Sequence, residues 1–152
     1  MWELAAFNIA KNRFALESAE MAEFVENLDR INTLGDESPG ALWRYKTDGG
    51  NSTDVRIFDD PDIIINYTVW ADIESLKAYT YQSAHVEFLR RRREWFVALT
   101  EWPAIVLWWV SVGERPGLEE AKRRLELLRD EGPTTQAFTF RDSFSPPDSA
   151  RQ

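Results

Sequence analysis

The chain has 152 residues, no cysteine, one histidine and a formal net charge of −8 at pH 7. Without cysteine it can form neither disulfides nor thiolate metal sites, and a zinc site of histidine and cysteine ligands is not expected. The excess of negative charge argues against a nucleic-acid-binding protein, because such proteins neutralise phosphates with lysine and arginine.

The length of the chain indicates one domain. A chain of this size buries enough surface to fold as a single unit. We expect the domain to span residues 1–141 and a disordered tail to follow over residues 142–152. The N-terminus does not match a secretory signal, and no stretch approaches the roughly 18 apolar residues of a membrane span. These features predict a cytoplasmic protein with no membrane partner.

The first half of the chain predicts a strand, a helix and two more strands. Residues 3–9 (ELAAFNI) form a short apolar run typical of a buried strand. A helix is expected between Ser18, a capping residue, and Gly35, because apolar residues recur there at helical spacing. Residues 41–46 (ALWRYK) alternate in side-chain type and residues 63–70 (IIINYTVW) are β-branched and aromatic, so both predict strands.

A long loop is expected between the second and third strands. Residues 47–62 (TDGGNSTDVRIFDDPD) are rich in glycine, asparagine and aspartate, a composition typical of turns. Long loops in compact domains are often functional, so this segment is a candidate lid, although variable surface explains it equally well.

The second half of the chain predicts a helix, a strand and a final helix. Asp72 is expected to cap a helix that continues to about Leu99, with a break near Ser83. Residues 104–112 (AIVLWWVSV) are apolar on both faces, as in a central strand that is covered on each side. Residues 118–130 (LEEAKRRLELLRD) have the pattern of an amphipathic helix.

The order of these elements predicts an α+β protein with a ferredoxin-like βαββαβ fold and a C-terminal helix. In that fold the helices cover one face of the sheet. Because the strand over residues 104–112 is apolar on both faces, the second face needs a cover as well. A second subunit is the simplest cover, so we expect a homodimer, the dimeric α/β barrel.

Four consecutive arginines follow the single histidine in YQSAHVEFLRRRREWF, residues 81–96. Successive residues of a helix are turned by about 100°, so the four side chains cannot share a face. Arg90 and Arg91 point away from the histidine, where Arg90 can pair with Glu94 and Glu87 with Arg91. We interpret this part of the run as a solvated, ion-paired surface and not as a nucleic-acid-binding patch.

Arg92 and His85 lie on the apolar stripe of the same predicted helix and are candidate site residues. An unpaired guanidinium is costly to bury, so Arg92 should meet a carboxylate, a carbonyl or an anionic ligand, unless its stem covers the core and its head reaches solvent. His85 is compatible with a structural, partly buried histidine and with a catalytic base.

Polar residues in the strands favour a pocket beneath this helix. Asn8, Asn66, Thr68 and Arg44 stand in strands whose other residues are mostly apolar, and inward-facing amides need partners. Polar groups that converge within an aromatic shell are typical of a small-molecule site.

Aromatic residues for such a shell are abundant, with seven tryptophans and nine phenylalanines. The candidates for contact with a substrate are Trp43, Trp70 and Tyr81. The tryptophans fit equally well as core residues or as dimer contacts.

Four parts of the chain carry a resemblance to a known family. They are LAAFNIA, MAEFVENLDRINTLGDESPGALWR, FDDP with IINYTVW, and above all YQSAHVEFLRRRREWF followed by LWWV. Together they resemble the DUF3291 family over roughly residues 3–141. The name of this family assigns no activity. Its members are placed in the dimeric α/β-barrel superfamily, so the resemblance implies two ferredoxin-like subunits packed sheet to sheet.

A more distant similarity rests on an asparagine in the first strand, TVW at the end of the third strand and SAH in the following helix. This pattern is similar to antibiotic-biosynthesis monooxygenases and bacterial heme-degrading monooxygenases. In the heme-degrading family an asparagine, a tryptophan and a heme-ligating histidine form the site. Asn8 and His85 match two of these residues. Tyr79 and Tyr81 stand where the family has its tryptophan, which departs from the heme pattern.

Three functions remain open. The first is an enzyme, a cofactor-independent monooxygenase, an isomerase or a cyclase, that acts on a hydrophobic or aromatic substrate. Its general base would be His85, with Asn8 as hydrogen-bond donor to an oxyanion. Arg92 or Arg44 would bind an anionic group of the substrate. The second is a dimeric protein that binds such a ligand without turnover, and the third is a heme-binding protein with His85 as iron ligand. We favour the first, which needs neither a metal nor a cofactor.

Overall fold

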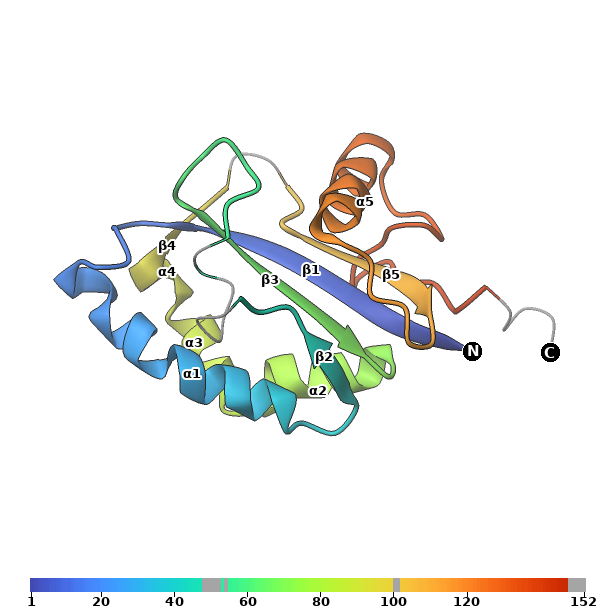
Figure 1. The fold of residues 1–152 in the computed structure, drawn as a ribbon, viewed down its shortest axis with the longest axis horizontal. Helices are drawn as coiled ribbons and strands as arrows, with labels where there is room; N and C mark the ends of the chain where they lie inside the picture. The colour runs from blue at the N-terminus through green and yellow to red at the C-terminus, as the bar shows by residue number, and fades with distance from the viewer. Residues whose placement is uncertain (48–52, 54, 100–101, 148–152) are drawn as a thin grey trace.

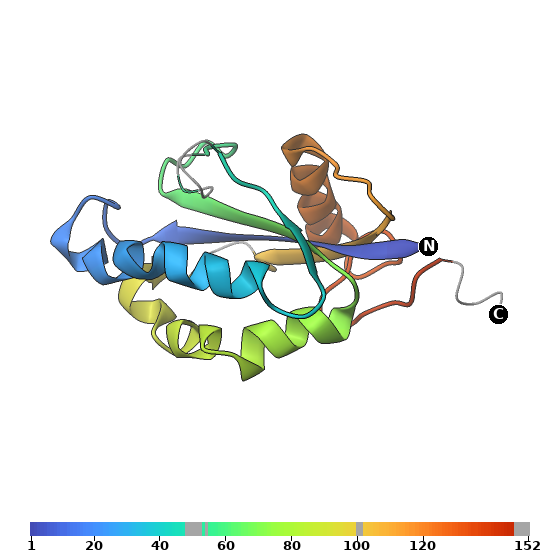
Figure 2. The same cartoon turned by 60° about the horizontal axis from the view of Figure 1, so that its bottom comes forward.

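The computed structural model describes residues 1–47, 53, 55–99 and 102–147. Within these residues a five-stranded antiparallel sheet forms the centre, and helices lie on both of its faces (Figures 1 and 2). The strands are β1 (Trp2–Asn12), β2 (Ala41–Arg44), β3 (Ile63–Trp70), β4 (Phe96–Val97) and β5 (Ile105–Ser111). The helices are η1 (Ala19–Met21, a 3-10 turn), α1 (Ala22–Asp36), α2 (Ile73–Gln82), α3 (His85–Arg90), α4 (Arg92–Trp95) and α5 (Leu118–Glu131).

The strand order is that of a ferredoxin-like fold. β1 lies at the centre, and β3 pairs with it along one side, from Leu4 opposite Trp70 to Lys11 opposite Ile63. On the other side β5 pairs with the first part of β1 and β4 with its last two residues, while β2 pairs with the outer edge of β3. The predicted α+β fold with a C-terminal helix is therefore confirmed. The sequence does not predict strand β4, because its two residues lie within the helix that is expected to continue to about Leu99.

Alternation along β1 separates two cores, as expected of a strand whose successive side chains point to opposite faces. Ala5, Phe7 and Ile9 face α5 and pack in a cluster with residues of β3, β5 and α5. Leu4 and Ala6 face the other side, where they cluster with Trp70, Leu76, Leu107 and Phe138.

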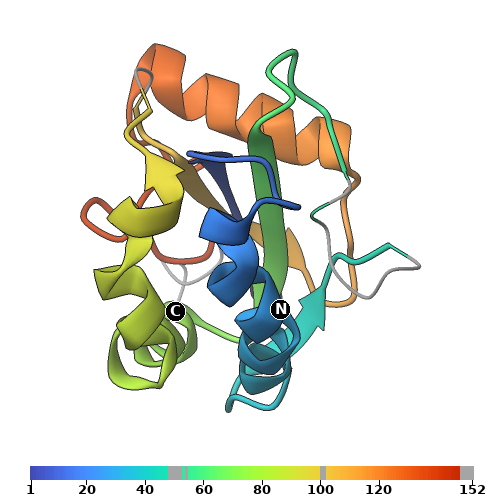
Figure 3. The ribbon, with the colours of Figure 1, turned by 90° about the vertical axis from the view of Figure 1, so that its left-hand side faces the viewer.

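α5 covers the face of the sheet for which a second subunit was expected. Its residues Ala121, Leu125 and Leu128 are at most 2% exposed and belong to the cluster on this side. Figure 3 shows α5 on one side of the sheet and α1 to α4 on the other. The reason given for a homodimer is therefore wrong, because the chain covers this face itself. A homodimer stays a prediction, and it would need another surface.

The C-terminal segment continues the fold beyond the predicted domain boundary. Leu107 and Phe138 exchange backbone hydrogen bonds of 2.8 and 2.9 Å along the outer edge of β5. Trp109 Nε1 donates to the carbonyl oxygen of Phe144 at 2.8 Å, and the Phe144 ring contacts Phe138. The chain is therefore held against β5 as far as Phe144, while the end of the predicted tail, 148–152, lies outside the described residues.

The helix predicted over residues 72–99 is divided into three. Asp72 caps α2 as predicted, since its side chain accepts a hydrogen bond from the backbone N–H of Ser75 at 2.8 Å. The extended backbone of Ser83 ends α2, and Arg91 separates α3 from α4. Both short helices still line one cavity, which lies between the sheet and helices α1 to α4. The apolar residues of the three helices keep the same helical spacing in the sequence across both breaks. For this reason the sequence pattern predicts one long helix.

The loop predicted over residues 47–62 lies partly outside the described residues, at 48–52 and 54. In the described part, Val55, Ile57 and Phe58 pack against the cluster beneath α5. This part of the segment therefore covers the α5 face of the sheet.

Candidate functional site

A cavity of about 1290 Å³ lies between the sheet and helices α1 to α4, on the face opposite α5. Side chains of β1, β2, β3 and β5 form its floor, and those of the four helices form its roof. Neither α1 nor α3 contains a fully buried residue, because both helices lie over the cavity and not directly against the sheet. The volume exceeds the roughly 300–1,000 Å³ that is typical of small-molecule sites, so the cavity can accommodate a ligand of several fused rings.

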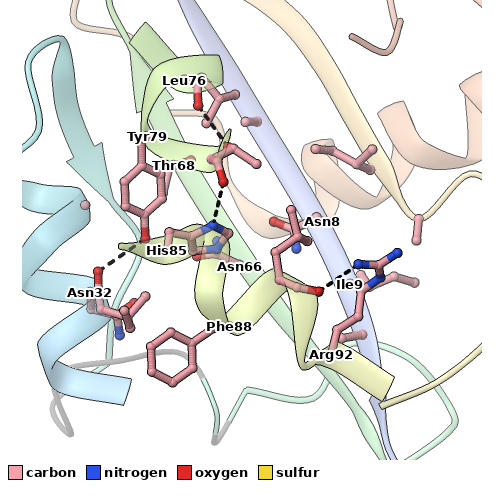
Figure 4. A pocket seen from close by; sticks show the side chains of 18 of the residues that line it. Asn8, Ile9, Asn32, Asn66, Thr68, Leu76, Tyr79, His85, Phe88 and Arg92 are labelled. Carbon is pink, nitrogen blue, oxygen red and sulfur yellow. Dashed lines mark hydrogen bonds between the residues drawn. The ribbon is translucent and has the colours of Figure 1, made fainter. Parts of the chain in front are cut away.

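His85 is the first residue of α3 and lines this cavity (Figure 4). Its Nδ1 lies 3.2 Å from the carbonyl oxygen of Thr80 in the last turn of α2. A carbonyl oxygen can only accept a hydrogen bond, so this contact assigns the proton to Nδ1. Nε2 then carries a lone pair and has no partner among the described residues.

Burial lowers the pKa of the His85 imidazole below its ordinary value of 6.5, and the hydrogen bond with Thr80 opposes this shift only in part. The ring is therefore neutral at pH 7 and can accept a proton. A neutral imidazole with one nitrogen oriented by a carbonyl is the usual arrangement of a histidine general base.

We expect His85 to contribute to the pH dependence of stability below pH 6.5. Below pH 6.5 the imidazole of the unfolded chain is mostly protonated. In the folded protein the same imidazole becomes protonated only at lower pH, because its pKa is lower. The free energy of unfolding should therefore fall as the pH decreases, and His85→Gln should remove this part of the fall. Urea unfolding of both proteins between about pH 7.5 and 5.5 measures the difference. Parallel pH curves would contradict a half-buried imidazole that stays neutral in the folded protein.

Trp70 and Tyr79 form an aromatic wall next to the histidine. Their rings are stacked with centroids 5.4 Å apart, and the Tyr79 ring lies 4.8 Å from that of His85. Trp70 Nε1 donates to Thr68 Oγ1 at 2.9 Å, and the Tyr79 hydroxyl donates to the carbonyl oxygen of Ile31 at 3.2 Å. Burial raises the pKa of Tyr79 to about 12. This phenol therefore stays protonated and forms a wall of the cavity, not a base.

Asn8 and Asn66 lie directly opposite each other on β1 and β3, and both line the cavity. Neither side-chain amide has a hydrogen-bond partner among the described residues. Figure 4 shows both amides on the sheet side of the cavity, across from the helix that carries His85. The two predicted asparagines therefore leave donors and acceptors for a ligand.

Among the four consecutive arginines, Arg91 is the one that forms ion pairs with other described residues. It contacts both carboxylate oxygens of Glu23 on α1, at 2.5 and 2.7 Å, and those of Glu94 at 2.8 and 3.0 Å. The predicted pairs Arg90 with Glu94 and Glu87 with Arg91 are wrong. They assumed a continuous helix, whereas the chain is not helical at Arg91, so this side chain turns toward α1.

The other two predicted arginines both line the cavity but differ in their partners. Arg92 donates through Nη1 to the carbonyl oxygen of Leu89 at 2.7 Å. Arg44 forms two bonds of 3.0 Å with the carboxylate of Asp36 at the end of α1. The charge of Arg44 is therefore largely compensated within the protein.

The predicted aromatic residues Trp43 and Tyr81 line the cavity, but their ring contacts are with residues other than His85. Trp43 contributes to the lining, but its ring contacts Tyr45 and Tyr67 at centroid distances of 6.2 and 5.1 Å, in the cluster beneath α5. Tyr81 is 52% exposed, and its ring lies 6.1 Å from Phe140 of the C-terminal segment. Both residues belong to the margin of the cavity.

Three further cavity residues, Tyr79, Thr80 and Asn32, were not predicted as site residues. Asn32 could have been found, because it follows Leu28 by four residues on the inward stripe of α1. Thr80 could not, because it contacts His85 through its backbone carbonyl, which any residue type provides.

Two features are absent from the described residues. These residues contain no group of three or more histidine, aspartate or glutamate residues that could hold a metal ion. In the same part of the chain, no helix has both the length and the apolar character needed to cross a membrane.

Three solved structures are similar to this chain at low sequence identity. NE2512, a protein of unknown function from Nitrosomonas europaea, is 14% identical, with 77% of this chain and 97% of that chain covered and a TM-score of 0.50. SnoaB from Streptomyces nogalater, a cofactor-independent oxygenase, is 16% identical, with coverages of 78% and 98% and a TM-score of 0.49. A dabb family protein with a ferredoxin-like fold from Mesorhizobium loti is 16% identical, with coverages of 74% and 100% and a TM-score of 0.49.

At these identities the comparison with NE2512 supports the fold alone, and none of the three assigns an activity to this chain. No curated protein matches the chain. The family described as "Domain of unknown function (DUF3291)" matches residues 3–152, which is nearly the whole sequence. This chain therefore belongs to the DUF3291 family.

Proposed function

We propose that this protein is a small-molecule enzyme that removes a proton from a carbon next to a carbonyl group in an aromatic or hydrophobic substrate. The observation that carries the proposal is the neutral imidazole of His85, whose Nδ1 is held by the Thr80 carbonyl while Nε2 stays without a partner among the described residues. Such a proton transfer can begin an isomerisation, a cyclisation or a cofactor-independent oxygenation.

The residues around His85 support this chemistry. In the proposed step the carbon–hydrogen bond breaks, the proton moves to Nε2, and the electron pair is delocalised onto the carbonyl oxygen of the substrate. The amide of Asn8 can donate a hydrogen bond to that oxygen, with Asn66 beside it on β3. The contact between Nδ1 and Thr80 stabilises the imidazolium that forms.

The walls of the cavity support a flat substrate. The stacked rings of Trp70 and Tyr79 lie on one side of His85, and Phe88 lines the cavity from α3. Aromatic surfaces of this kind favour ring stacking and exclude water from the reacting carbon.

Deuterium exchange into simple ketones tests the proposal. A panel of bicyclic aromatic ketones, such as 2-tetralone, is incubated with the protein in D₂O, and loss of the proton next to the carbonyl is followed by NMR. Exchange that depends on the protein supports the enzyme. If ketones bind, as measured by tryptophan fluorescence, but none exchanges faster than in buffer, the protein is a ligand-binding protein without turnover.

Heme binding is a second candidate, favoured by Nε2 of His85, which has no partner among the described residues. Histidines that bind metals usually have their other ring nitrogen held by a carbonyl or carboxylate, as His85 has. His85 would hold the iron, Arg92 and Arg93 would suit the propionates, and bound heme would supply redox chemistry. One equivalent of hemin should then produce a Soret band that His85→Ala abolishes. A spectrum of free hemin in the presence of the protein would exclude this candidate.

A further inference from the structure

We infer that the ligand of this cavity is an aromatic or hydrophobic acid and that Arg92 binds its carboxylate. The inference rests on the proposed function to the extent that it concerns the same cavity, and it adds the chemical class of the ligand. It depends on the charge of the cavity lining, on the partners of Arg44 and Arg92, and on the apolar residues that line the cavity next to Arg92 in the chain.

The cavity differs in charge from the protein as a whole. The chain has a formal net charge of −8. The described residues that line the cavity include four cations and a single carboxylate: Arg44, Lys46, Arg92, Arg93 and Asp36. A concave site of one sign concentrates ligands of the opposite sign. The arrangement therefore favours anionic ligands, although the overall charge disfavours them.

The cations of the lining are not equally available. Arg44 is held by two hydrogen bonds to Asp36, the only carboxylate of the described lining. Arg92 lies within ion-pair distance of no carboxylate among the described residues, and its one hydrogen bond goes to the carbonyl of Leu89. A carbonyl orients a guanidinium without neutralising its charge, so Nε and Nη2 of Arg92 remain for a ligand.

The position of Arg92 suits a ligand that also reaches the histidine. Figure 4 shows its side chain extending from α4 toward β1, on the same side of the helices as His85 and the two asparagines. The lining next to it in the chain is apolar, with Leu89, Trp95 and Phe96. A carboxylate at Arg92 would therefore continue into an apolar or aromatic body that extends toward His85.

A pair of matched ligands tests the inference. 2-Naphthoate and 2-naphthamide have nearly the same shape, and only the first is charged at pH 7. Calorimetric titration of the wild-type protein at low ionic strength should give an affinity for 2-naphthoate that is at least about tenfold higher. Arg92→Gln should bring the two affinities together, and Arg92→Lys should restore part of the preference because it keeps the charge but not the planar fork.

Arg90→Gln is the matched control, because Arg90 is exposed and lies outside the cavity lining. It should keep the full preference. Equal affinities of wild-type protein for the two compounds would overturn the inference and leave the proposed function standing, since deuterium exchange is measured on neutral ketones. A preference that survives in Arg92→Gln but disappears in Arg93→Gln would overturn the assignment to Arg92. Failure of both compounds to bind at millimolar concentration would also overturn the inference.

Discussion

His85→Gln should reduce protein-dependent deuterium exchange by about 10²- to 10⁴-fold, the range that a positioned general base contributes. Glutamine is similar in size to histidine and can still donate to the Thr80 carbonyl, but it cannot accept a proton near neutral pH. Ligand affinity, measured by tryptophan fluorescence, should change by only a few fold. The loss should therefore appear in the exchange rate and not in binding.

Glu87→Gln is a suitable control for this experiment, because Glu87 lies on the same short helix but is exposed and does not line the cavity. It should exchange at the wild-type rate. Exchange that persists in His85→Gln would assign the base to another group and would contradict the proposed role of the imidazole.

The pH profile of exchange provides an independent test of the same assignment. Burial lowers the pKa of His85, so half of the imidazole is neutral at a pH below 6.5 and the neutral fraction rises with pH from there. The rate should follow this fraction and reach a plateau within about two pH units above that pKa. A rate that continues to rise toward pH 10 would point to a phenol or an amine as the base.

Leu125→Ala should lower the free energy of unfolding by about 2 to 5 kcal/mol, the range observed for buried leucines in well-packed cores. Leu125 is 0% exposed, at the centre of the contact between α5 and the sheet. Removal of the leucine side chain would leave a void between α5 and the sheet. The rings of Tyr67 and Trp108, which belong to the same cluster, are stacked on each other and cannot move into this void.

The neighbouring Glu126→Ala is the control for α5, because Glu126 is exposed. It should change the stability by less than about 0.5 kcal/mol. Urea unfolding of both variants measures the two effects. A loss below about 1 kcal/mol for Leu125→Ala would mean that α5 does not pack on the sheet, and it would reopen this face to a second subunit.

Much of the fold could be predicted because its strands and its last helix have simple patterns. The β-branched run over residues 63–70 matches β3 in both bounds, and the amphipathic pattern over residues 118–130 matches α5 to within one residue. The docking of α5 could not be predicted in the same way. An amphipathic pattern reveals which face of a helix is apolar, but not which surface of the protein that face will cover.

Part of the candidate site could also be predicted, because simple sequence patterns place its residues. Alternation in β1 and β3 and the helical repeat were enough to bring Asn8, Asn66 and His85 to one cavity. The ion pair of Arg44 with Asp36 joins residues of different elements across a turn, so no helical spacing reveals it. The tautomer of His85 depends on a backbone carbonyl, which carries no signal in the sequence.

The protonation state of His85 in solution tests the central claim most directly. His85 is the only histidine of the chain, so in protein without a polyhistidine tag its ring nitrogens are assigned in a ¹⁵N NMR spectrum without further experiments. We predict a proton on Nδ1, a pKa below 6.5, and a change in the Nε2 signal when an aromatic ligand binds. A pKa at or above 6.5, or an Nε2 signal that ignores a bound ligand, would contradict a neutral base that is open to the cavity.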